Sequence, residues 1–578
     1  MKDWTELAER WGICASFVDA QGQTRAATPE AIRRISEALQ AAGDGAAWND
    51  AAPHVVPAYQ GDGRRGWLLA VQLYAVRSRR NWGHGDFTDL AALVRLAAEI
   101  GAAGIGLNPL HALIWDQPGH ASPYSPNSRL FLNPLYIDVE AIPEWMPELS
   151  LVDDVARLRE TDLVDYEGVA RIKHAALRHA YRNFRESARH ERTADLDRFR
   201  DERGETLARF VAFEVLRRKF HGAWWEWPRE WRRPSSGAIA DLRKSDADEF
   251  GFHEFLQWTA DRQLAACAEI ARQRGLPVGL YVDMAVGVDG GGADAWIEQD
   301  IFLTGLSIGA PPDIYNPAGQ DWKLTSYSPN GLAARHFAPL RTVLQSVTRH
   351  AGAIRLDHAM GLMRLYLVPG DLGPKNGAYI RFPFEHLLSV VADESRRAKC
   401  IVIGEALGTV PEGLVERLSA WGLWSYLVMM FERDWDGIYR APNRYPVRAL
   451  ATFNTHDLPT FAGWMSGYDL ALKRSIGVDP GESDAERERS RHELRVVLSS
   501  DGGSFIPVAE FLACTPSRMV SIGIEDVLCL RDQVNVPGTS SKHPNWRRRL
   551  PVNVEDLAGD QRLAALASAL ARAGRGAG

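Results

Sequence analysis

The amino-acid sequence predicts an α/β fold: a (β/α)8 TIM barrel with helical insertions and a small N-terminal helical region. Eight short apolar runs have the length and the polar flanks of buried strands. Helix-period segments separate most of these runs, which is typical of parallel strands joined by helical crossovers, and the number eight favours a closed barrel. The runs cover residues 67–76, 103–110, 277–285, 353–358, 400–405, 424–431, 449–455 and 519–528.

The segments between these runs repeat apolar residues every three or four positions, which is the spacing of one helix face. Such a face can pack against the outside of a barrel, so these segments are predicted to be the crossover helices. The clearest ones cover residues 87–99, 332–347, 384–397 and 484–498.

One long interval, from about residue 141 to residue 273, contains no run that resembles a strand. It is rich in Arg, Glu, Leu and Ala, and helical patterns occur at 168–184, 203–218 and 252–274. The charged positions are interpreted as solvated helix faces. We therefore expect a helical subdomain inserted between the second and third barrel strands.

Residues 1–65 differ from the rest of the chain. Two short amphipathic helices are expected at 4–11 and 29–39, and a loop rich in Ala, Gly, Asp and Pro follows at 42–65. We divide the chain into an N-terminal helical region, 1–65, and a barrel domain, 66–578. The sequence assigns no role to the first of these.

The composition narrows the class of protein. The 578 residues are 46% hydrophobic and 24% charged, which is ordinary for a globular protein, and the net charge of -7 disfavours nucleic-acid and anionic membrane partners. No apolar run approaches 18 residues, and the charged start MKDWTELAER does not read as a secretory signal. Five widely spaced cysteines without a CxxC pair favour reduced thiols, so we expect a cytoplasmic protein.

Polar groups follow the predicted strands at the ends where barrel enzymes carry their chemistry. A single acid at a strand end often caps a helix or pairs with an arginine, but a set that converges on one rim favours a catalytic site. The groups are Asp283 after the third run, Arg355 and Asp357 in the fourth, Glu405 in the fifth, His456 and Asp457 after the seventh, and Glu525 and Asp526 in the eighth.

Two of these carboxyls suit a paired acid–base mechanism. Arg355 and Asp357 are two residues apart on one strand and share a face, so the guanidinium should lower the pKa of Asp357 and suit it to act as a nucleophile. Glu405 ends the apolar run CIVIG, and burial should raise its pKa, as a general acid requires. Such a pair cleaves glycosidic bonds, with retention when the carboxyls are roughly 5 Å apart. Asp457 would be a third carboxylate that stabilises the charge of the transition state.

Several motifs, in this order and spacing, make the chain resemble the glycoside hydrolase family 77 amylomaltases, which are 4-alpha-glucanotransferases. The resemblance covers about residues 67–553. Its motifs are VQLYAVRSRRNWGHGDF (71–87), SPYSPNSRLFLNPLYID (122–138), GLPVGLYVDMAVG (275–287), IGAPPDIYNPAGQDW (308–322), IRLDHAMGLMRLYLVP (354–369), IGEALGTVP (403–411), NTHDLPT (454–460) and QVNVPGTSSKHPNWRRRLP (533–551).

The resemblance implies that Asp357 is the nucleophile, Glu405 the acid/base and Asp457 the transition-state stabiliser. It implies that the substrates are maltodextrins and other α-1,4-glucans, and that no organic cofactor takes part. The sixteen histidines show no HxxxH spacing, and no catalytic metal is predicted.

The resemblance also implies a set of substrate-binding residues. Arg355 and His456 would contact the donor-site glucose, Tyr124 would stack on it, and Asp283 and Asp313 would hydrogen-bond glucan hydroxyls. The segment 308–327, with Tyr315, Trp322 and Tyr327, would shape the acceptor side.

The chain departs from the family pattern at two places. Ala406 stands where the family usually has Asp, directly after Glu405, and we expect its side chain to face away from the site because side chains alternate along a strand. Lys323 and Thr325 stand where the family has Gly and Pro.

Two other functions stay open at this point. A hydrolase on the same fold would use the same carboxylates, and only the choice between water and an acceptor sugar separates it from a transferase; the resemblance favours transfer. A catalytically dead glucan-binding protein is disfavoured because all three carboxylates are present. The sequence does not set the oligomeric state or the preferred glucan length.

Overall fold

The computed structural model describes residues 2–18, 22–43, 52–312, 318–435, 437–539 and 541–576. Eight parallel strands close into a barrel in chain order, and each predicted run overlaps one of them, so the predicted (β/α)8 barrel is confirmed. The strands are β3 (Gly66–Val71), β4 (Gly104–Leu107), β7 (Gly279–Met284), β11 (Ala353–Leu356), β14 (Ile401–Gly404), β15 (Trp424–Val428), β16 (Ala449–Thr452) and β17 (Met519–Gly523).

Side-chain alternation divides each barrel strand between an inner and an outer core. In β3, for example, Leu68 belongs to a small buried cluster, whereas Trp67 and Leu69 belong to the large cluster that includes the surrounding helices. All eight strands, or the residues directly before them, contribute to the small cluster, which therefore fills the barrel interior. Its buried members are Leu68, Ala103, Val278, Tyr281, Ala353, Ile401, Ile403, Trp424, Leu450 and Met519.

Three of the four predicted crossover helices form as expected: α3 (Phe87–Glu99), α13 (Phe384–Ala398) and α17 (Asp484–Leu498). The single helix predicted at 332–347 is wrong, because α11 (Pro329–Ala334) and α12 (Ala338–Val347) occupy this region separately. His336 and Phe337 between them have left-handed φ values of 50° and 60°, which end one helix before the next begins.

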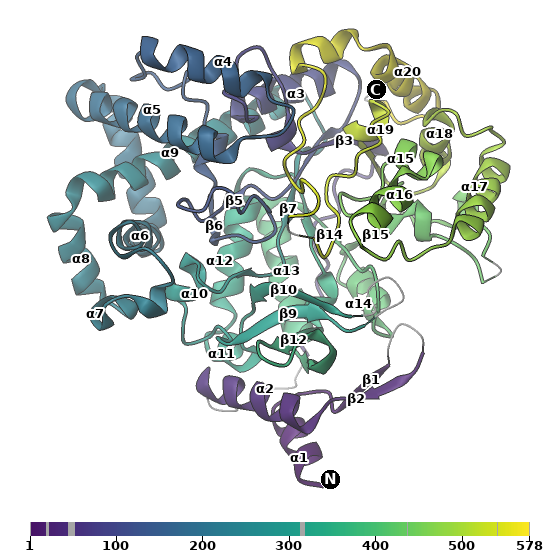
Figure 1. The fold of residues 1–578 in the computed structure, drawn as a ribbon, viewed down its shortest axis with the longest axis horizontal. Coiled ribbons are helices and arrows are strands. Elements are labelled where there is room, and N and C mark those ends of the chain that lie inside the picture. The colour runs from purple at the N-terminus through teal and green to yellow at the C-terminus, as the bar shows by residue number, and fades with distance from the viewer. Residues whose placement is uncertain are drawn as a thin grey trace.

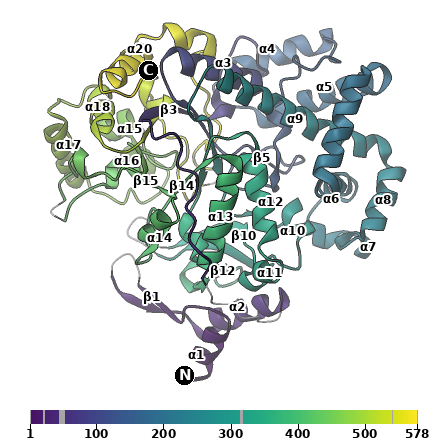
Figure 2. The same cartoon turned by 180° about the vertical axis from the view of Figure 1, so that it is seen from behind.

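The interval without strand signals holds a group of helices along one side of the barrel (Figure 1, Figure 2). Helix α9 packs against α3 of the barrel and thereby ties this group to it. Within the described residues, no helix has both the length and the apolar character needed to cross a bilayer. The group comprises α4 (Val152–Glu160), α5 (Tyr166–Ser187), α6 (His190–Phe220), α7 (Arg229–Arg232), α8 (Ser236–Ser245) and α9 (Ala247–Gln273).

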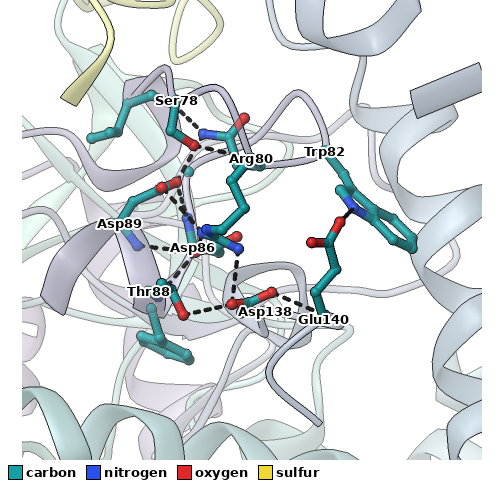
Figure 3. Close-up of polar contacts among 12 residues, drawn as sticks. Ser78, Arg80, Trp82, Asp86, Thr88, Asp89, Asp138 and Glu140 are labelled. Atoms are coloured by element: carbon teal, nitrogen blue, oxygen red, sulfur yellow. Dashed lines mark hydrogen bonds and ion pairs between the residues drawn. The ribbon is translucent and has the colours of Figure 1, made fainter. Parts of the chain in front are cut away.

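A buried ion-pair cluster fastens the loop after β3 to the root of this insertion (Figure 3). Arg80 pairs with Asp86, with Asp89 at 3.1 Å and with Asp138 at 2.8 Å. Asp86 and Asp89 also form the capping box that starts α3. Burial, together with the two neighbouring carboxylates, raises the pKa of Asp86 to about 7. Asp86, Asp89 and Asp138 therefore have a structural role in this chain.

A five-stranded antiparallel sheet that the sequence did not predict lies beside the barrel (Figure 1). Its strands come from the connections after β7 and after β11, so it stands on the rim where those strands end. The order is β13 (Ala378–Arg381), β12 (Arg364–Pro369), β9 (Leu306–Ala310), β10 (Gln320–Thr325) and β8 (Val288–Asp289).

The N-terminal region extends this sheet. The two predicted helices are present as α1 (Lys2–Arg10) and α2 (Pro29–Ala41), but strands β1 (Ser16–Val18) and β2 (Thr24–Ala26) pair between them and were not predicted. Cys14 N–H donates to Tyr379 O at 2.8 Å, and Arg381 N–H donates to Gly12 O at 2.9 Å. The Phe17 ring lies edge-on to Tyr379 at 5.2 Å. These contacts cover the β13 edge.

Candidate active site

The predicted polar groups meet at the carboxyl ends of the barrel strands. Arg355 on β11 lies in register with Asp283 on β7 and with Ile403 on β14, so the ends of these strands are level. Asp357 and Glu405 directly follow two of these strands, and the loop after β16 carries His456.

Arg355 is the centre of the site. Its Nη1 lies 2.7 Å from Asp283 Oδ2 and 2.8 Å from Asp357 Oδ1, and its Nη2 lies 3.7 Å from Glu405 Oε2. Its guanidinium also packs over the Tyr426 ring at 5.4 Å. One buried cation therefore holds three carboxylates together, which is the arrangement that its five donors and planar shape allow.

Two backbone groups fix the Glu405 carboxyl. Its Oε2 accepts a hydrogen bond from His358 N–H at 2.8 Å, and its Oε1 accepts one from Leu407 N–H at 2.6 Å. His358 has a left-handed φ of 49°, a conformation that costs a non-glycine residue about 1–2 kcal/mol. This strained residue directly follows Asp357, so the two carboxyls are connected through adjacent backbone positions and one hydrogen bond.

The pKa values of this pair are set mainly by burial. Burial raises the pKa of Asp357 to about 7; the Arg355 cation opposes this, and Asp283 and Glu405 add to it. The prediction that Arg355 leaves the pKa of Asp357 below its ordinary value is therefore wrong. Burial among several acids raises this pKa by more than the ion pair with Arg355 lowers it. Burial also raises the pKa of Glu405, as predicted. Two carboxyls that interact in this way titrate as a pair.

The pKa of Asp457 is shifted in the opposite direction. Partial burial raises its pKa, but His456 and Asn535 outweigh this and leave the pKa below its ordinary value. The contacts are His456 Nε2 to Asp457 Oδ2 at 3.5 Å and Asn535 Nδ2 to Asp457 Oδ1 at 2.6 Å. Asp457 raises the pKa of His456 in turn, against the effect of burial. The Asp457 carboxylate is therefore held ionised.

Tyr124 joins the two sides of the site. Its hydroxyl donates to Asp283 Oδ2 at 2.5 Å, and its ring stacks on His456 with centroids 4.7 Å apart. These three side chains line one pocket, together with Arg355, Glu525 and others.

The rim sheet brings only part of the predicted acceptor segment to this site. Trp322 on β10 lies edge-on to His358, with ring centroids 5.1 Å apart. Tyr327 is buried and packs elsewhere: its ring centroid lies 4.4 Å from that of Phe302, and the Arg129 guanidinium lies over its ring. Asp313 and Tyr315 lie outside the described residues.

Lys323 keeps the backbone conformation that a glycine would adopt at low cost. Its φ is 60°, and the Asp321 carboxylate holds it through Lys323 N–H at 3.0 Å and Lys323 Nζ at 2.5 Å. The side chain that replaces glycine therefore supplies a local ion pair in a strained part of β10.

Three functional contacts were missed in the sequence. Asn535 fixes Asp457, Tyr426 supports Arg355, and His358 donates its N–H to Glu405. Asn535 lies in the family motif at 533–551, so the motif could have suggested that it belongs to the site. The His358 donor is a backbone N–H, which every residue except proline has, so the sequence does not reveal it. Within the described ranges, no three His, Cys, Asp or Glu side chains are grouped to hold a metal ion.

A barrel whose strand ends carry two buried carboxyls of raised pKa on one arginine, next to a third carboxyl of lowered pKa, defines an enzyme of the carboxylate-pair glycosidase class. The chain belongs to glycoside hydrolase family 77, whose family model, described as 4-alpha-glucanotransferase, matches residues 71–554.

Similar proteins agree with this membership. A 4-alpha-glucanotransferase of Mycobacterium tuberculosis is 38% identical over 547 residues, which cover 88% of this chain and 75% of the relative. A 4-alpha-glucanotransferase of Haemophilus influenzae is 33% identical over 531 residues, which cover 85% of this chain and 76% of the relative. The crystal structure of amylomaltase from Corynebacterium glutamicum has a TM-score of 0.85 at 27% identity and covers 98% of this chain and 99% of its own.

Proposed function

We propose that the chain moves α-1,4-glucan segments between maltodextrins by a retaining double displacement, with Asp357 as nucleophile and Glu405 as acid and base. The observation that carries this proposal is the shared Arg355 guanidinium, which contacts Asp357 at 2.8 Å and Glu405 at 3.7 Å. Two carboxyls joined through one cation are compatible with the separation of about 5–6 Å that retention requires, which stays a prediction.

In the first step Glu405 is protonated and Asp357 is ionised. Glu405 protonates the glycosidic oxygen while Asp357 attacks the anomeric carbon, so that a glycosyl ester forms and the reducing-end portion of the donor leaves. Backbone N–H groups of His358 and Leu407 hold the Glu405 carboxyl in place and stabilise it when it becomes an anion.

In the second step Glu405 removes the proton from the 4-hydroxyl of an acceptor glucan. That oxygen attacks the anomeric carbon and releases Asp357, which restores both protonation states. Asp457 is ionised and stabilises the positive charge that develops on the sugar in each step. Transfer wins over hydrolysis when a bound acceptor presents its hydroxyl to the anomeric carbon in the right orientation. The effective molarity of such an oriented hydroxyl can reach about 10⁵ M or more, which exceeds the concentration of water.

The remaining predicted residues bind the glucan in this proposal. Tyr124 stacks on the donor-site glucose, and Arg355, His456 and Asp283 bind its hydroxyls, as their common pocket supports. Asp313 is proposed to bind glucan hydroxyls on the basis of sequence alone. Trp322 faces an acceptor sugar, in keeping with its contact to His358.

A cytoplasmic location is part of the same proposal. All five cysteines are free thiols, and Cys514 and Cys529 are exposed. Exposed thiols persist most easily in a reducing compartment.

Incubation with maltotriose is expected to give glucose and a ladder of longer maltodextrins at nearly constant total reducing ends. Each transfer breaks one α-1,4 bond and makes another, whereas hydrolysis adds a reducing end at every turnover. Chromatography of the products together with a reducing-end assay measures both quantities. A steady rise in reducing ends without products longer than maltotriose would identify a hydrolase and refute the transferase.

Ala406→Asp, which restores the usual family residue, is expected to change kcat/KM on maltotriose by less than about tenfold, or roughly 1.4 kcal/mol. The orientation of this side chain stays a prediction, because β14 ends at Gly404 and strand alternation does not extend to it. The added carboxylate should raise the pKa of Glu405 further, so the pH above which the rate falls should move upward. A pH–rate profile of both forms measures this shift. Complete loss of activity would mean that position 406 contacts the substrate.

A further inference from the structure

A second pocket lies outside the barrel, where the helical insertion meets it. Strand β6 (Ser128–Leu132) packs against both α9 of the insertion and α12 of the barrel (Figure 1). Side chains from these three elements, from α6 and from β7 line this outer pocket. Among the described residues, none lines both the outer pocket and the pocket of the candidate active site, so the two are separate features of the fold.

Strand β7 forms a wall between the two pockets. Val282 lines the outer pocket, whereas its neighbours Tyr281 and Asp283 line the pocket of the candidate active site. Successive side chains of a strand point to opposite faces. A ligand in the outer pocket therefore packs against the back of the strand that carries Asp283.

Much of the lining of the outer pocket is apolar. Leu110, Phe131, Phe199 and Leu264 are buried side chains that contribute to it. Such a surface favours the apolar part of a ligand, because binding removes that part from water.

Arg203 of α6 brings a positive charge into this pocket. Its Nη2 donates to Leu130 O at 2.6 Å, and both Nη atoms lie 3.3 Å from Ser346 Oγ. Its guanidinium also packs over the Phe131 ring at 4.9 Å. A guanidinium has five N–H donors, so these contacts leave donors of Arg203 for a ligand.

The acids near Arg203 are paired with other cations. Asp261 pairs with Arg262 at 2.8 Å and with Arg349 at 3.1 Å, and Glu202 pairs with Arg349 at 2.7 Å. In the part of the chain that the structure describes, no carboxylate lies at ion-pair distance from Arg203 itself. Burial and the Arg349 cation lower the pKa of Arg203. A bound anion would offset both effects.

Helix α6 holds Arg203 in this position. Phe199 and Arg203 are four residues apart and lie on the same face of the helix. The helix bends directly after them at Gly204, whose φ of 50° and ψ of −133° only glycine adopts at low cost. The contacts to Leu130 and Ser346 then fix the guanidinium, so that little conformational entropy is lost when it binds a ligand.

We infer that the outer pocket binds an amphipathic carboxylate, whose carboxyl accepts hydrogen bonds from Arg203 and whose apolar chain packs on the apolar lining. The single charge of a carboxylate matches the one unpaired cation, and its planar shape suits a guanidinium. A phosphate monoester carries about −1.5 to −2 charges, and Asp261 and Glu202 would repel the excess. The inference does not rest on the proposed function, because no residue of the glucan pocket takes part.

The test is isothermal titration calorimetry of the full chain with sodium butyrate as the probe and sodium chloride as the salt control. We expect a dissociation constant on the order of 1 mM, since a ligand of so few atoms gains a limited binding free energy. Butyramide has nearly the same shape without the charge and should bind at least about tenfold more weakly. Inorganic phosphate should bind more weakly than butyrate.

Variants locate the site. Arg203→Met retains the length of the side chain without its charge and should weaken butyrate binding at least about tenfold, whereas Arg203→Lys should keep part of the affinity. Val347→Phe should abolish binding, because Val347 lines the pocket and the larger ring fills it. Arg209→Met is the matched control and should bind like wild type, since Arg209 lies on the same helix, pairs with Glu205 and is not part of the lining.

Thermal unfolding without ligand shows whether each variant is folded. Absence of butyrate binding to the wild type in the millimolar range would overturn the inference. So would equal affinities of the wild type and Arg203→Met for butyrate, or tighter binding of phosphate than of butyrate. If Arg203→Met does not fold, equal affinities of the wild type for butyrate and butyramide, or undiminished binding by Val347→Phe, would overturn it instead.

Discussion

Asp357→Asn is expected to lower the rate of maltotriose disproportionation by a factor on the order of 10⁴ or more, which is about 5.5 kcal/mol in the activation barrier. An amide cannot form the glycosyl ester, although it nearly preserves the shape of the carboxylate. The Asn amide can no longer accept the full ion pair from Arg355, which keeps its contacts to Asp283 and Glu405. The fold should therefore persist while the chemistry is lost.

Steady-state rates and thermal unfolding of the same preparation check this result. Asp371→Asn is a suitable control, because Asp371 is an exposed acid that pairs with Arg34 far from the pocket residues. That variant should keep its activity. Near wild-type turnover of maltotriose by Asp357→Asn would show that another group forms the covalent bond.

Glu405→Gln is expected to lower maltotriose turnover by about 10³-fold or more, since general acid–base catalysis contributes about 10²–10⁴ and this residue serves in both steps. The amide has one acceptor oxygen, so it can keep only one of the two hydrogen bonds from His358 and Leu407, and that bond holds the side chain at one end. An α-maltosyl fluoride, whose leaving group needs no proton, should still glycosylate Asp357. The ester should then accumulate because no base activates the acceptor.

Mass spectrometry of the intact protein after addition of the fluoride measures this accumulation. One maltosyl unit should appear on Glu405→Gln, and peptide mapping should place it on Asp357. The double variant with Asp357→Asn should carry none. An unlabelled Glu405→Gln enzyme that still cleaves the fluoride at a high rate would contradict the assignment of Asp357 as nucleophile.

The barrel could be predicted because its strands are buried on both faces. In β14, for example, Ile401, Val402 and Ile403 are all buried, although they alternate between the barrel interior and the surrounding helices. Such a strand is a continuous apolar run in the sequence, and Glu405 interrupts the run where the strand ends. The position of these polar groups at the carboxyl ends of the strands was predictable for the same reason.

The rim sheet and the charge state of the pair were not predictable in this way. The Gln320–Thr325 strand carries polar residues and a register shift between Asp321 and Leu324, so it lacks both an apolar run and a regular alternation. The pKa of Asp357 depends on how many other acids the fold brings to Arg355. The sequence places Arg355 beside Asp357, but it does not show how deeply Asp357 is buried or how closely Asp283 and Glu405 approach it, and it therefore suggests the wrong direction for this pKa.

The contact between the N-terminal segment and β13 has a consequence for biosynthesis. Cys14 and Gly12 pair with Tyr379 and Arg381, which lie more than half of the chain away. At about 5–20 residues per second, the ribosome makes these partners roughly 20–70 s after the segment itself. Until then Phe17 lacks the ring of Tyr379, against which it packs in the folded chain. The first residues to be synthesised are thus among the last to reach their final position.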